Sequence, residues 1–309
     1  MQTILITGGA GFIGSHIQDA CLQAGYQVCV IDDLSTGFID NVHDKAELLQ
    51  VDIQNAEEVE QIFQDKKIDV VCHHAAQINV RHSVQDPQND AEINVLGSLN
   101  ILEASRKHDV KKVVFASTGG ALYGDTSNVP TSEEQILNPY SPYGISKLSV
   151  EKYLHYYYRE YGLKYGILRY SNVYGPRQNE KSEAGVVSIF INKMLRNENP
   201  IIFGTGEQTR DYVFVEDIVK ANMMLMQNID ACDVFNVGTG KETNVNQLFD
   251  IINSHFGDRF LKKYSDALQG EQLRSALDYS KIQKTLHWKP EITLNEGIEK
   301  TWNFFKGII

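Results

Sequence analysis

Apolar residues fall into short, unbroken runs across the first part of the chain. The runs are rich in β-branched residues and end in glycine or polar residues, so they predict buried strands at residues 3–7, 27–31, 70–73, 112–116 and 165–168. Between them, apolar positions recur at helical spacing and predict helices at residues 12–24, 56–65, 93–108 and 143–161. Buried strands that alternate with helices are typical of a parallel sheet covered on both faces.

The alternation changes after residue 172. Glycine-rich turns at 204–206 and 238–240 separate shorter elements, and helices are predicted at residues 185–196, 216–227, 245–256 and 294–306. We therefore predict an α/β fold, with a Rossmann-type doubly wound parallel sheet in residues 1–172 and a smaller C-terminal α/β substrate lobe in residues 173–309. No shift in composition marks the boundary, so we expect the chain to pass between the two parts.

Composition and charge exclude several kinds of partner. The 309 residues are 42% hydrophobic and 22% charged, which is ordinary for a globular protein. The net charge of −11 opposes binding to nucleic acid or to an anionic membrane surface. No run reaches the roughly 18 apolar residues that a spanning helix needs. The chain passes from Met1-Gln2 directly into an apolar run without a basic leader, so a cytoplasmic location is expected.

The cysteines and histidines show no metal-binding pattern. The four cysteines have no paired spacing, and we interpret them as free thiols of a reducing compartment: Cys21, Cys29, Cys72 and Cys232. The pair His73-His74 follows a predicted strand, and we interpret it as structural. We expect no bound metal.

A glycine-rich turn directly follows the first predicted strand. Gly8, Gly11 and Gly14 are spaced three apart, between that strand and the first predicted helix. Gly8 allows a sharp turn, Gly11 lets backbone amides approach a pyrophosphate, and Gly14 lets the helix pack close to the strand. The start of a helix adds partial positive charge that favours an anion. Strand, turn and helix together predict a dinucleotide site.

An acidic residue in the expected place indicates which dinucleotide binds. Asp32 ends the second predicted strand, where a carboxylate accepts hydrogen bonds from ribose hydroxyls and repels a 2′-phosphate. The alternative role, a turn cap, is one that Asp33 alone could fill. No arginine lies between Asp32 and Asp52 to bind an extra phosphate. The sequence predicts NAD as the cofactor.

A tyrosine and a lysine four residues apart form a candidate catalytic pair. Tyr143 and Lys147 lie on one face of a predicted helix that Pro142 begins. An ammonium beside a phenol favours the phenolate, so we expect Lys147 to lower the pKa of Tyr143 and make it a base. Ser117 and Thr118 end a predicted strand, where one hydroxyl could bind a substrate oxygen and the other could cap the strand.

These motifs resemble those of the extended short-chain dehydrogenase/reductases, and within them the UDP-glucose 4-epimerases (UDP-galactose 4-epimerases). The resemblance covers essentially the whole chain. It rests on TGGAGFIGSH at the start, Asp52-Ile53, His74-Ala75-Ala76, NVLG from Asn94, SPYGISK from Ser141, LRYSNVYGPR from Leu168 and RDYV from Arg210.

The resemblance implies site residues by position. Those expected to contact NAD are Gly8, Gly11, Phe12, Ile13, Gly14, Asp32, Ser35, Gly37, Asp52, Ile53, Ala75, Asn94, Ser117, Tyr143, Lys147 and Tyr170. Those expected to contact the UDP-sugar are Thr118, Asn172, Val187, Arg210, Arg274 and Ser275, with Arg210 on the diphosphate. Tyr143, Lys147 and Thr118 are the expected catalytic residues.

The implied reaction is the reversible inversion of carbon 4 of a UDP-hexose through a 4-keto intermediate. Tyr143 takes the 4-hydroxyl proton while hydride passes to NAD, Lys147 tunes Tyr143, and Thr118 orients the sugar. We expect UDP-glucose and UDP-galactose as substrates. Ser275 replaces a bulky tyrosine of related epimerases, which predicts room for the N-acetylhexosamine pair as well.

Alternative functions share most of these residues. A UDP-N-acetylglucosamine 4-epimerase would use the same chemistry, and a UDP-glucuronate 4-epimerase would need a further cation near the sugar, for which Arg81 and Lys181 are candidates. A simple alcohol dehydrogenase would need added NAD. A noncatalytic NAD-sensing protein of this fold is disfavoured because such proteins typically lose the Tyr-Lys pair.

Two segments depart from the family pattern. Gly119 holds the usual position of the catalytic hydroxyl, so Thr118, or Ser117 through a water, must replace it. The 4,6-dehydratases need an Asp-Glu pair where Gly119-Gly120 stand, which argues against that activity. The basic RPGD-like segment reads Leu268-Gln269-Gly270-Glu271 here, so one phosphate-binding arginine is missing and Arg274 is its expected partial replacement.

The family resemblance also implies a homodimer. The predicted helix at 143–161 carries more aromatic surface than one core face can bury: Tyr153, Tyr156, Tyr157 and Tyr161. Together with residues 96–108 it is expected to form a two-fold symmetric four-helix bundle. Packing inside one chain is the alternative.

Overall fold

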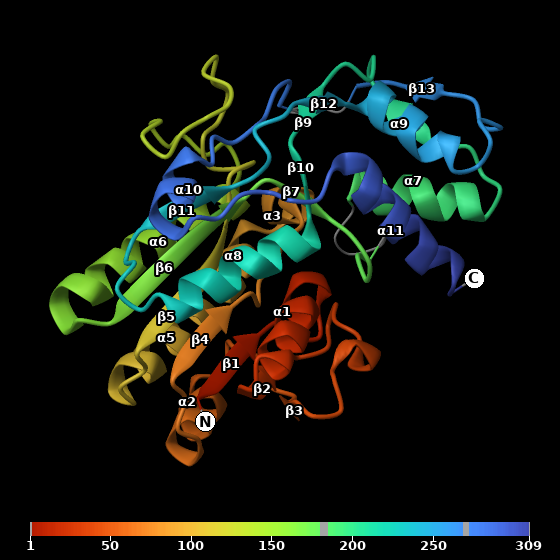
Figure 1. Cartoon of the computed structure of the whole chain (residues 1–309). Coiled ribbons are helices and arrows are strands. Elements are labelled where there is room, and N and C mark those ends of the chain that lie inside the picture. Colours follow the sequence, from red (N-terminus) through yellow and green to blue (C-terminus); the bar gives the residue numbers. More distant parts are fainter. Residues whose placement is uncertain (1, 180–184, 268–271, 309) are drawn as a thin grey trace.

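The centre of the protein is a seven-stranded sheet in which every neighbouring pair of strands is parallel (Figure 1). The computed structural model describes residues 2–179, 185–267 and 272–308. In order across the sheet, the strands are β11 (Val234–Val237), β6 (Lys164–Tyr170), β5 (Lys112–Thr118), β4 (Val70–His73), β1 (Thr3–Thr7), β2 (Gln27–Ile31) and β3 (Glu47–Leu49). The strand order therefore reverses between β1 and β4.

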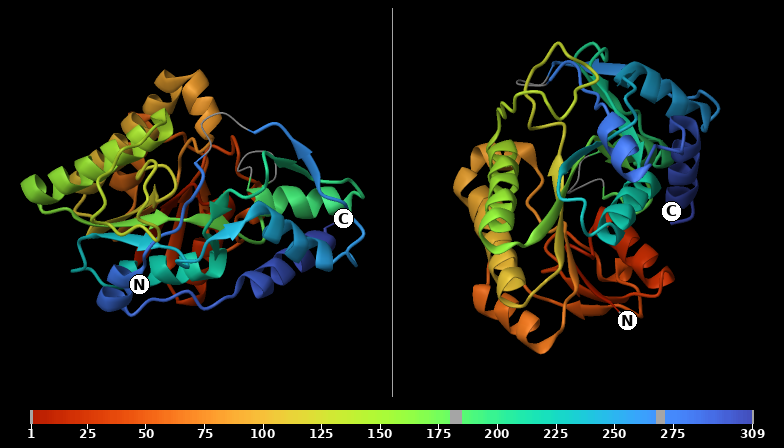
Figure 2. Two further views of the ribbon diagram at one scale, coloured as in Figure 1. Left: turned by 90° about the horizontal axis from the view of Figure 1, so that it is seen from above. Right: turned by 60° about the vertical axis from the view of Figure 1, so that its left-hand side comes forward.

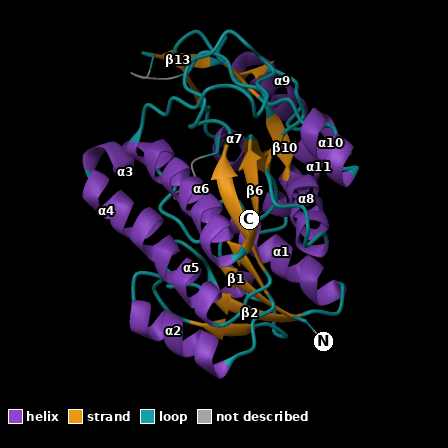
Figure 3. Ribbon diagram, turned by 90° about the vertical axis from the view of Figure 1, so that its left-hand side faces the viewer, coloured by secondary structure: helices purple, strands orange, loops and turns teal. Residues whose placement is uncertain are grey.

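Helices cover both faces of the sheet, as Figures 2 and 3 show. Ile4 and Ile6 of β1 pack toward α1 (Phe12–Gln23) and α8 (Val215–Gln227). Leu5 faces the opposite way, toward the layer of α2 (Ala56–Asp65), α5 (Ser98–Lys107) and α6 (Pro142–Tyr161). Because side chains alternate along a strand, the continuous apolar runs supply both cores at once.

The C-terminal part adds a smaller group of elements beside this sheet (Figure 1). Its helices are α7 (Val186–Leu195), α9 (Val245–Ser254) and α11 (Leu294–Lys306), which pack around an apolar core that includes Phe190 and Phe249. Short strand pairs accompany them: β7 (Asn172–Tyr174) with β10 (Tyr212–Phe214), β9 (Thr209–Arg210) with β12 (Thr243–Asn244), and β8 (Ile201–Phe203) with β13 (Lys263–Ser265). Strand β11 comes after residue 172 but pairs with β6 in the large sheet, and helix α8 packs against that sheet. Helix α10 (Ser280–Leu286) packs against β11.

The predicted fold class is confirmed, and the differences concern short or irregular elements. The single helix predicted at 93–108 is a π-helical turn, Glu92–Gly97, followed by α5. Four short helices were not predicted: η1 (Ile39–Asn41), α3 (Val80–Gln85), α4 (Pro87–Ala91) and α10. Elements of two to seven residues show too few periods for a pattern to identify them.

The cysteines lie where the apolar runs place them. Cys21, Cys29 and Cys72 are buried, Cys232 is half-buried, and all four are free thiols. Within the described part of the chain, no helix combines the length and the apolar character needed to cross a membrane.

Candidate active site

The strand order reverses between β1 and β4, and this switch point lies at the carboxyl edge of the sheet. In doubly wound sheets, ligands bind at this switch point because the loops on its two sides diverge. The glycine-rich turn follows β1, and the predicted catalytic strand end lies on β5, next to β4. The two sets of residues predicted from sequence therefore share one edge of the sheet.

The glycine-rich turn forms a cradle that only glycines allow. Gly8 adopts φ +70°, and a Cβ there would lie 2.7 Å from the Ala75 amide nitrogen. A Cβ at Gly14 would clash with the Gly8 carbonyl oxygen. Helix α1 begins after Gly11 with no side-chain cap and no acidic residue in its first turn. These uncapped amides at a helix N-terminus fit the diphosphate of NAD.

Asp32 lies beside the glycine-rich turn, between it and the loop after β2. Its carboxylate accepts hydrogen bonds from the backbone N–H of Ala10 and of Leu34, both at 2.9 Å, and a Cβ at Gly37 would lie 3.0 Å from its Oδ1. Burial raises the pKa of Asp32, while the two N–H donors act in the opposite direction. The carboxylate is thus held between the glycine turn and the loop after β2, as ribose recognition requires. The hydroxyl of Ser35 donates to Asp33 at 2.7 Å instead.

Several other predicted NAD contacts have side chains that are engaged within the protein. Asn94 is 2% exposed and bonds the backbone of Gln77 through both its oxygen and its nitrogen. The Tyr170 hydroxyl bonds Asn222, and its ring stacks on His74. The remaining predicted contacts lie around the cradle with apolar or locally bonded side chains: Phe12 and Ile53 are buried, Ile13 is half-buried, and Asp52 accepts from Gln54.

Helix α6 presents Tyr143 and Lys147 on one face, as predicted. Ser141 caps the helix by accepting the Gly144 N–H at 3.2 Å, and Pro142 occupies the first turn. The Lys147 ammonium donates to the carbonyl of Ala116 on β5 at 2.9 Å and lies 5.9 Å from the centroid of the Tyr143 ring. This bond attaches the catalytic helix to the predicted catalytic strand.

The expected effect of Lys147 on Tyr143 is corrected by the structure. Burial and the nearby Asp90 carboxylate raise the pKa of Tyr143 rather than lower it. Burial also lowers the pKa of Lys147 to about 8, against the opposing effect of Asp90 and Glu151. The sequence showed the favourable i,i+4 lysine, but it could not show how strongly the surroundings penalise a phenolate.

The two hydroxyls at the end of β5 point to opposite faces of the sheet. Ser117 is 4% exposed and donates to the Glu151 carboxylate at 2.6 Å. Thr118 is half-buried on the other face. Gly119 follows, and the Leu277 side chain fills the space that a side chain at 119 would occupy. The Ser117 hydroxyl is therefore engaged by Glu151, and Thr118 stays the predicted ligand-binding hydroxyl.

The predicted substrate residues lie on elements of the C-terminal part. Arg210 is half-buried on β9 and donates to the Thr209 carbonyl at 2.8 Å. Asn172 is exposed, and its N–H bonds the Asp211 carbonyl. Ser275 is 8% exposed.

Two predicted substrate contacts have side chains that are engaged within the protein. The Arg274 side chain is engaged with both oxygens of Glu242, at 2.9 and 2.6 Å, so a phosphate would have to displace that carboxylate. The Val187 side chain is 1% exposed in the C-terminal core, so only its backbone at the start of α7 can meet a ligand. Arg81 is exposed on α3. Lys181 and the segment Leu268–Glu271 lie outside the described residues.

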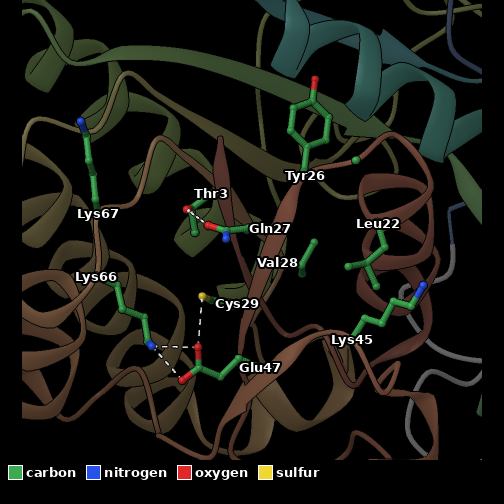
Figure 4. Close-up of a pocket in the computed structure, with 11 residues that line it drawn as sticks. Thr3, Leu22, Tyr26, Gln27, Val28, Cys29, Lys45, Glu47, Lys66 and Lys67 are labelled. Atoms are coloured by element: carbon green, nitrogen blue, oxygen red, sulfur yellow. Dashed lines mark hydrogen bonds and ion pairs between the residues drawn. The ribbon is translucent and has the colours of Figure 1, made fainter. Parts of the chain in front are cut away.

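A groove of about 630 Å³ lies at the amino ends of β1 to β3, on the opposite edge of the sheet from the site described above (Figure 4). Lys66 lines it and is paired with Glu47 at 2.7 Å, while Thr3 is bonded to Gln27. None of the predicted NAD or sugar contacts lines this groove.

Three buried charged residues near the site were not predicted. Asp90 accepts hydrogen bonds from Ser146, Gln77 and Asn94 beside α6. Glu151 and Arg169 form an ion pair at 2.6 Å, with side chains 4% and 5% exposed. A signal existed, since Glu151 follows Lys147 by one helical turn and Arg169 interrupts an otherwise apolar strand.

Comparisons with known proteins agree with this geometry. The UDP-glucose 4-epimerase of Mycolicibacterium smegmatis is 41% identical over 307 residues, covering 98% of both chains. The crystal structure of the Thermotoga maritima UDP-glucose 4-epimerase with UDP-glucose has a TM-score of 0.96 at 47% identity, covering 99% of each chain. A UDP-N-acetylglucosamine 4-epimerase from Methanobrevibacter ruminantium has a TM-score of 0.94 at 36% identity, covering 100% and 99% of the two chains. A family model matches residues 4–238, and the chain belongs to the NAD dependent epimerase/dehydratase family.

Proposed function

We propose that this protein is a UDP-sugar 4-epimerase that interconverts UDP-glucose and UDP-galactose. The observation that carries the proposal is the bond from Lys147 to the Ala116 carbonyl, because it fixes the Tyr143 helix beside the strand end that bears Thr118. This pair lies at the same edge of the sheet as the glycine cradle. The similarity to UDP-glucose 4-epimerases over nearly the whole chain supports the assignment.

The residues divide the chemistry as follows. Bound NAD supplies the hydride acceptor. Tyr143 removes the proton of the 4-hydroxyl as carbon 4 loses hydride, and it returns the proton after hydride comes back to the opposite face of the sugar. The Lys147 ammonium offsets part of the cost of charging the buried phenol, and the Thr118 hydroxyl orients the sugar oxygen. No net oxidation occurs, so the cofactor need not leave.

The sugar range is proposed to include the N-acetylated pair. Ser275 is a small, nearly buried side chain, and its segment crosses the catalytic strand end through Leu277. A related structure is that of a UDP-N-acetylglucosamine 4-epimerase, which supports the wider sugar range. Glucuronate remains the second candidate, since the exposed Arg81 on α3 is a cation not engaged in the cradle.

A homodimer is proposed from the outer face of α6. Tyr153, Tyr156 and Tyr161 are 38%, 46% and 49% exposed, although Tyr157 is buried and bonds Glu103 within the chain. Three large aromatic side chains on one helix face favour burial against a second copy. We also propose a cytoplasmic location, because the buried free thiols suit a reducing compartment.

The decisive experiment uses the protein as purified, without added NAD. Mass spectrometry of the released ligand is expected to find NAD. NMR of UDP-glucose, UDP-galactose, their N-acetylated counterparts and UDP-glucuronate is expected to show conversion between C4 epimers. Activity that requires added NAD and accumulates an oxidised product would identify a dehydrogenase instead, and absence of turnover on the whole panel would overturn the proposal.

A further inference from the structure

A row of buried polar residues runs across the sheet directly beneath the proposed catalytic residues. Ser117 on β5, Arg169 on β6 and Asn236 on β11 are register partners in neighbouring parallel strands. They are 4%, 4% and 0% exposed. Polar residues this deeply buried occur where every group is satisfied, and here the partners are two side chains lying over the row, Glu151 and Tyr123, and one backbone carbonyl.

Glu151 of α6 lies over the middle of the row. Arg169 donates to both of its oxygens, at 2.9 and 2.6 Å, and Ser117 donates to Oε1 at 2.6 Å. Glu151 lies one helical turn beyond Lys147, which bonds the carbonyl of Ala116. Two successive turns of α6 are therefore attached to two successive residues of β5, and Thr118 is the next residue of that strand.

The row also reaches the segment that carries Ser275, the residue proposed to set the sugar range. Arg169 donates to the Tyr123 hydroxyl at 2.9 Å, and Tyr123 donates to Asn236 at 2.7 Å. Asn236 in turn donates to the Thr131 carbonyl at 2.9 Å. Thr131 bridges Leu277, two residues after Ser275.

We propose that Glu151, held by Arg169, is a positioning residue that fixes the register of the Tyr143–Lys147 helix against the Thr118 strand end. This inference rests on the proposed function. A bidentate ion pair has a defined direction, so it restrains both the rotation and the translation of the helix. Apolar packing alone restrains these movements less strictly. Displacing a catalytic group by about 1 Å can cost about 10² in rate, so such a lock has kinetic consequences.

The negative charge of Glu151 gives a second way to test the proposal, through the pH optimum of turnover. The titratable groups around Lys147 are Asp90 from α4, His73 at the end of β4 and His74 directly after it, and Tyr143 and Glu151 on its own helix. Removing the Glu151 charge leaves Arg169 unpaired and makes the site more positive. A more positive site lowers the pKa of both Lys147 and Tyr143, so the pH optimum of turnover moves down.

The test compares Glu151→Gln with Lys112→Met, a control at the other end of the same strand. Lys112 is fully buried and donates to three backbone carbonyls far from the carboxyl edge, so its loss destabilises the fold without touching the site. For Glu151→Gln we expect kcat per folded molecule to fall about 10- to 100-fold with KM changed less than about threefold, and the pH optimum to move down by about half a unit or more. Lys112→Met keeps kcat and pH optimum.

Further variants keep the test decisive if Glu151→Gln folds poorly. Ser117→Ala removes one bond to Glu151 but leaves the ion pair, and we expect kcat per folded molecule to fall about threefold, with a lower melting temperature because a buried hydrogen bond to a carboxylate is lost. Exchange of backbone amide hydrogens, followed by mass spectrometry, should show faster exchange at residues 143–147 in Glu151→Gln but not in Lys112→Met. Unchanged kcat, pH optimum and exchange in Glu151→Gln, or unchanged kcat in Ser117→Ala, would overturn the proposal. If the wild type turns over no UDP-sugar, the proposed function fails, and the exchange measurement still decides the positioning role.

Discussion

Tyr143 is the residue on which the proposed chemistry depends most. Replacing it with phenylalanine keeps the ring, which is buried at the start of α6, and removes only the hydroxyl. Because Tyr143 is the proposed acceptor of the 4-hydroxyl proton, Tyr143→Phe is expected to lower turnover by about 10² or more with folding unchanged. Turnover followed by NMR, with circular dichroism as the folding control, tests this. Near-normal turnover would remove Tyr143 from the mechanism.

The neighbouring hydroxyls Thr118 and Ser117 allow a sharper comparison. Ser117 is turned toward Glu151, whereas Thr118 lies on the opposite face of β5. We expect Thr118→Ala to lower kcat about tenfold more than Ser117→Ala, since only the first removes a hydrogen bond to the sugar. Steady-state kinetics of both variants on one UDP-hexose measures this. A larger loss in Ser117→Ala would show that the hydroxyl register is wrong.

Ser275 is the residue expected to set the sugar range. It is 8% exposed, so a tyrosine there must displace its surroundings or extend toward the proposed sugar site. Ser275→Tyr is expected to suppress turnover of the N-acetylated pair by about 10- to 100-fold while sparing the plain hexoses, because specificity is a difference between two barriers. Relative kcat/KM on the two pairs is the measurement. Equal loss on both would show that Ser275 does not face the sugar.

At the level of elements, β5 carries a buried cation network at each end, and the one at its amino end governs stability. Lys112 donates to the carbonyls of Leu225, Asn228 and Ala231, near the end of α8. Lys112→Met leaves these carbonyls without their donor, and we expect about 2–4 kcal/mol lower free energy of unfolding at pH 7. Denaturant unfolding checks the value. A loss below about 0.5 kcal/mol would contradict this role.

The same lysine gives a pH dependence with a definite sign. Burial lowers the pKa of Lys112 to about 8, below its ordinary 10.5. Between these values the unfolded chain binds more protons than the folded one, so the contribution of Lys112 to stability rises with pH over that range. The difference in unfolding free energy between wild type and Lys112→Met should therefore grow from pH 8 to pH 10. A difference that shrinks would contradict the shift.

The elements also show what a sequence can and cannot reveal. The glycine turn and the pair on α6 were predictable because each depends on spacing within one element. The Glu151–Arg169 pair joins a helix to a strand, and the engagement of Arg274 by Glu242 joins two distant segments, so neither follows from local spacing. Likewise, β11 was absent from the predicted sheet because its four residues pair with β6 only after a long stretch of chain that lies outside the sheet.

For the whole molecule, the outer face of α6 predicts assembly. Tyr153, Tyr156 and Tyr161 are each more than one-third exposed, and burying such side chains against a symmetric copy is favourable. Light scattering at micromolar concentration is expected to give about twice the chain mass of 34.9 kDa. Introducing two charges with Tyr153→Glu and Tyr156→Glu should yield monomers, because unpaired charges are costly in an apolar interface.

A matched control separates this face from exposed tyrosine in general. Tyr264 on β13 is 53% exposed and belongs to the C-terminal part, away from α6. Tyr264→Glu should leave the mass unchanged, because this tyrosine is not on the proposed interface. A wild-type mass near that of one chain would contradict the dimer directly. A dimer that survives both substitutions on α6 would show instead that the copies meet through another surface, and that the tyrosines of α6 pack only within their own chain.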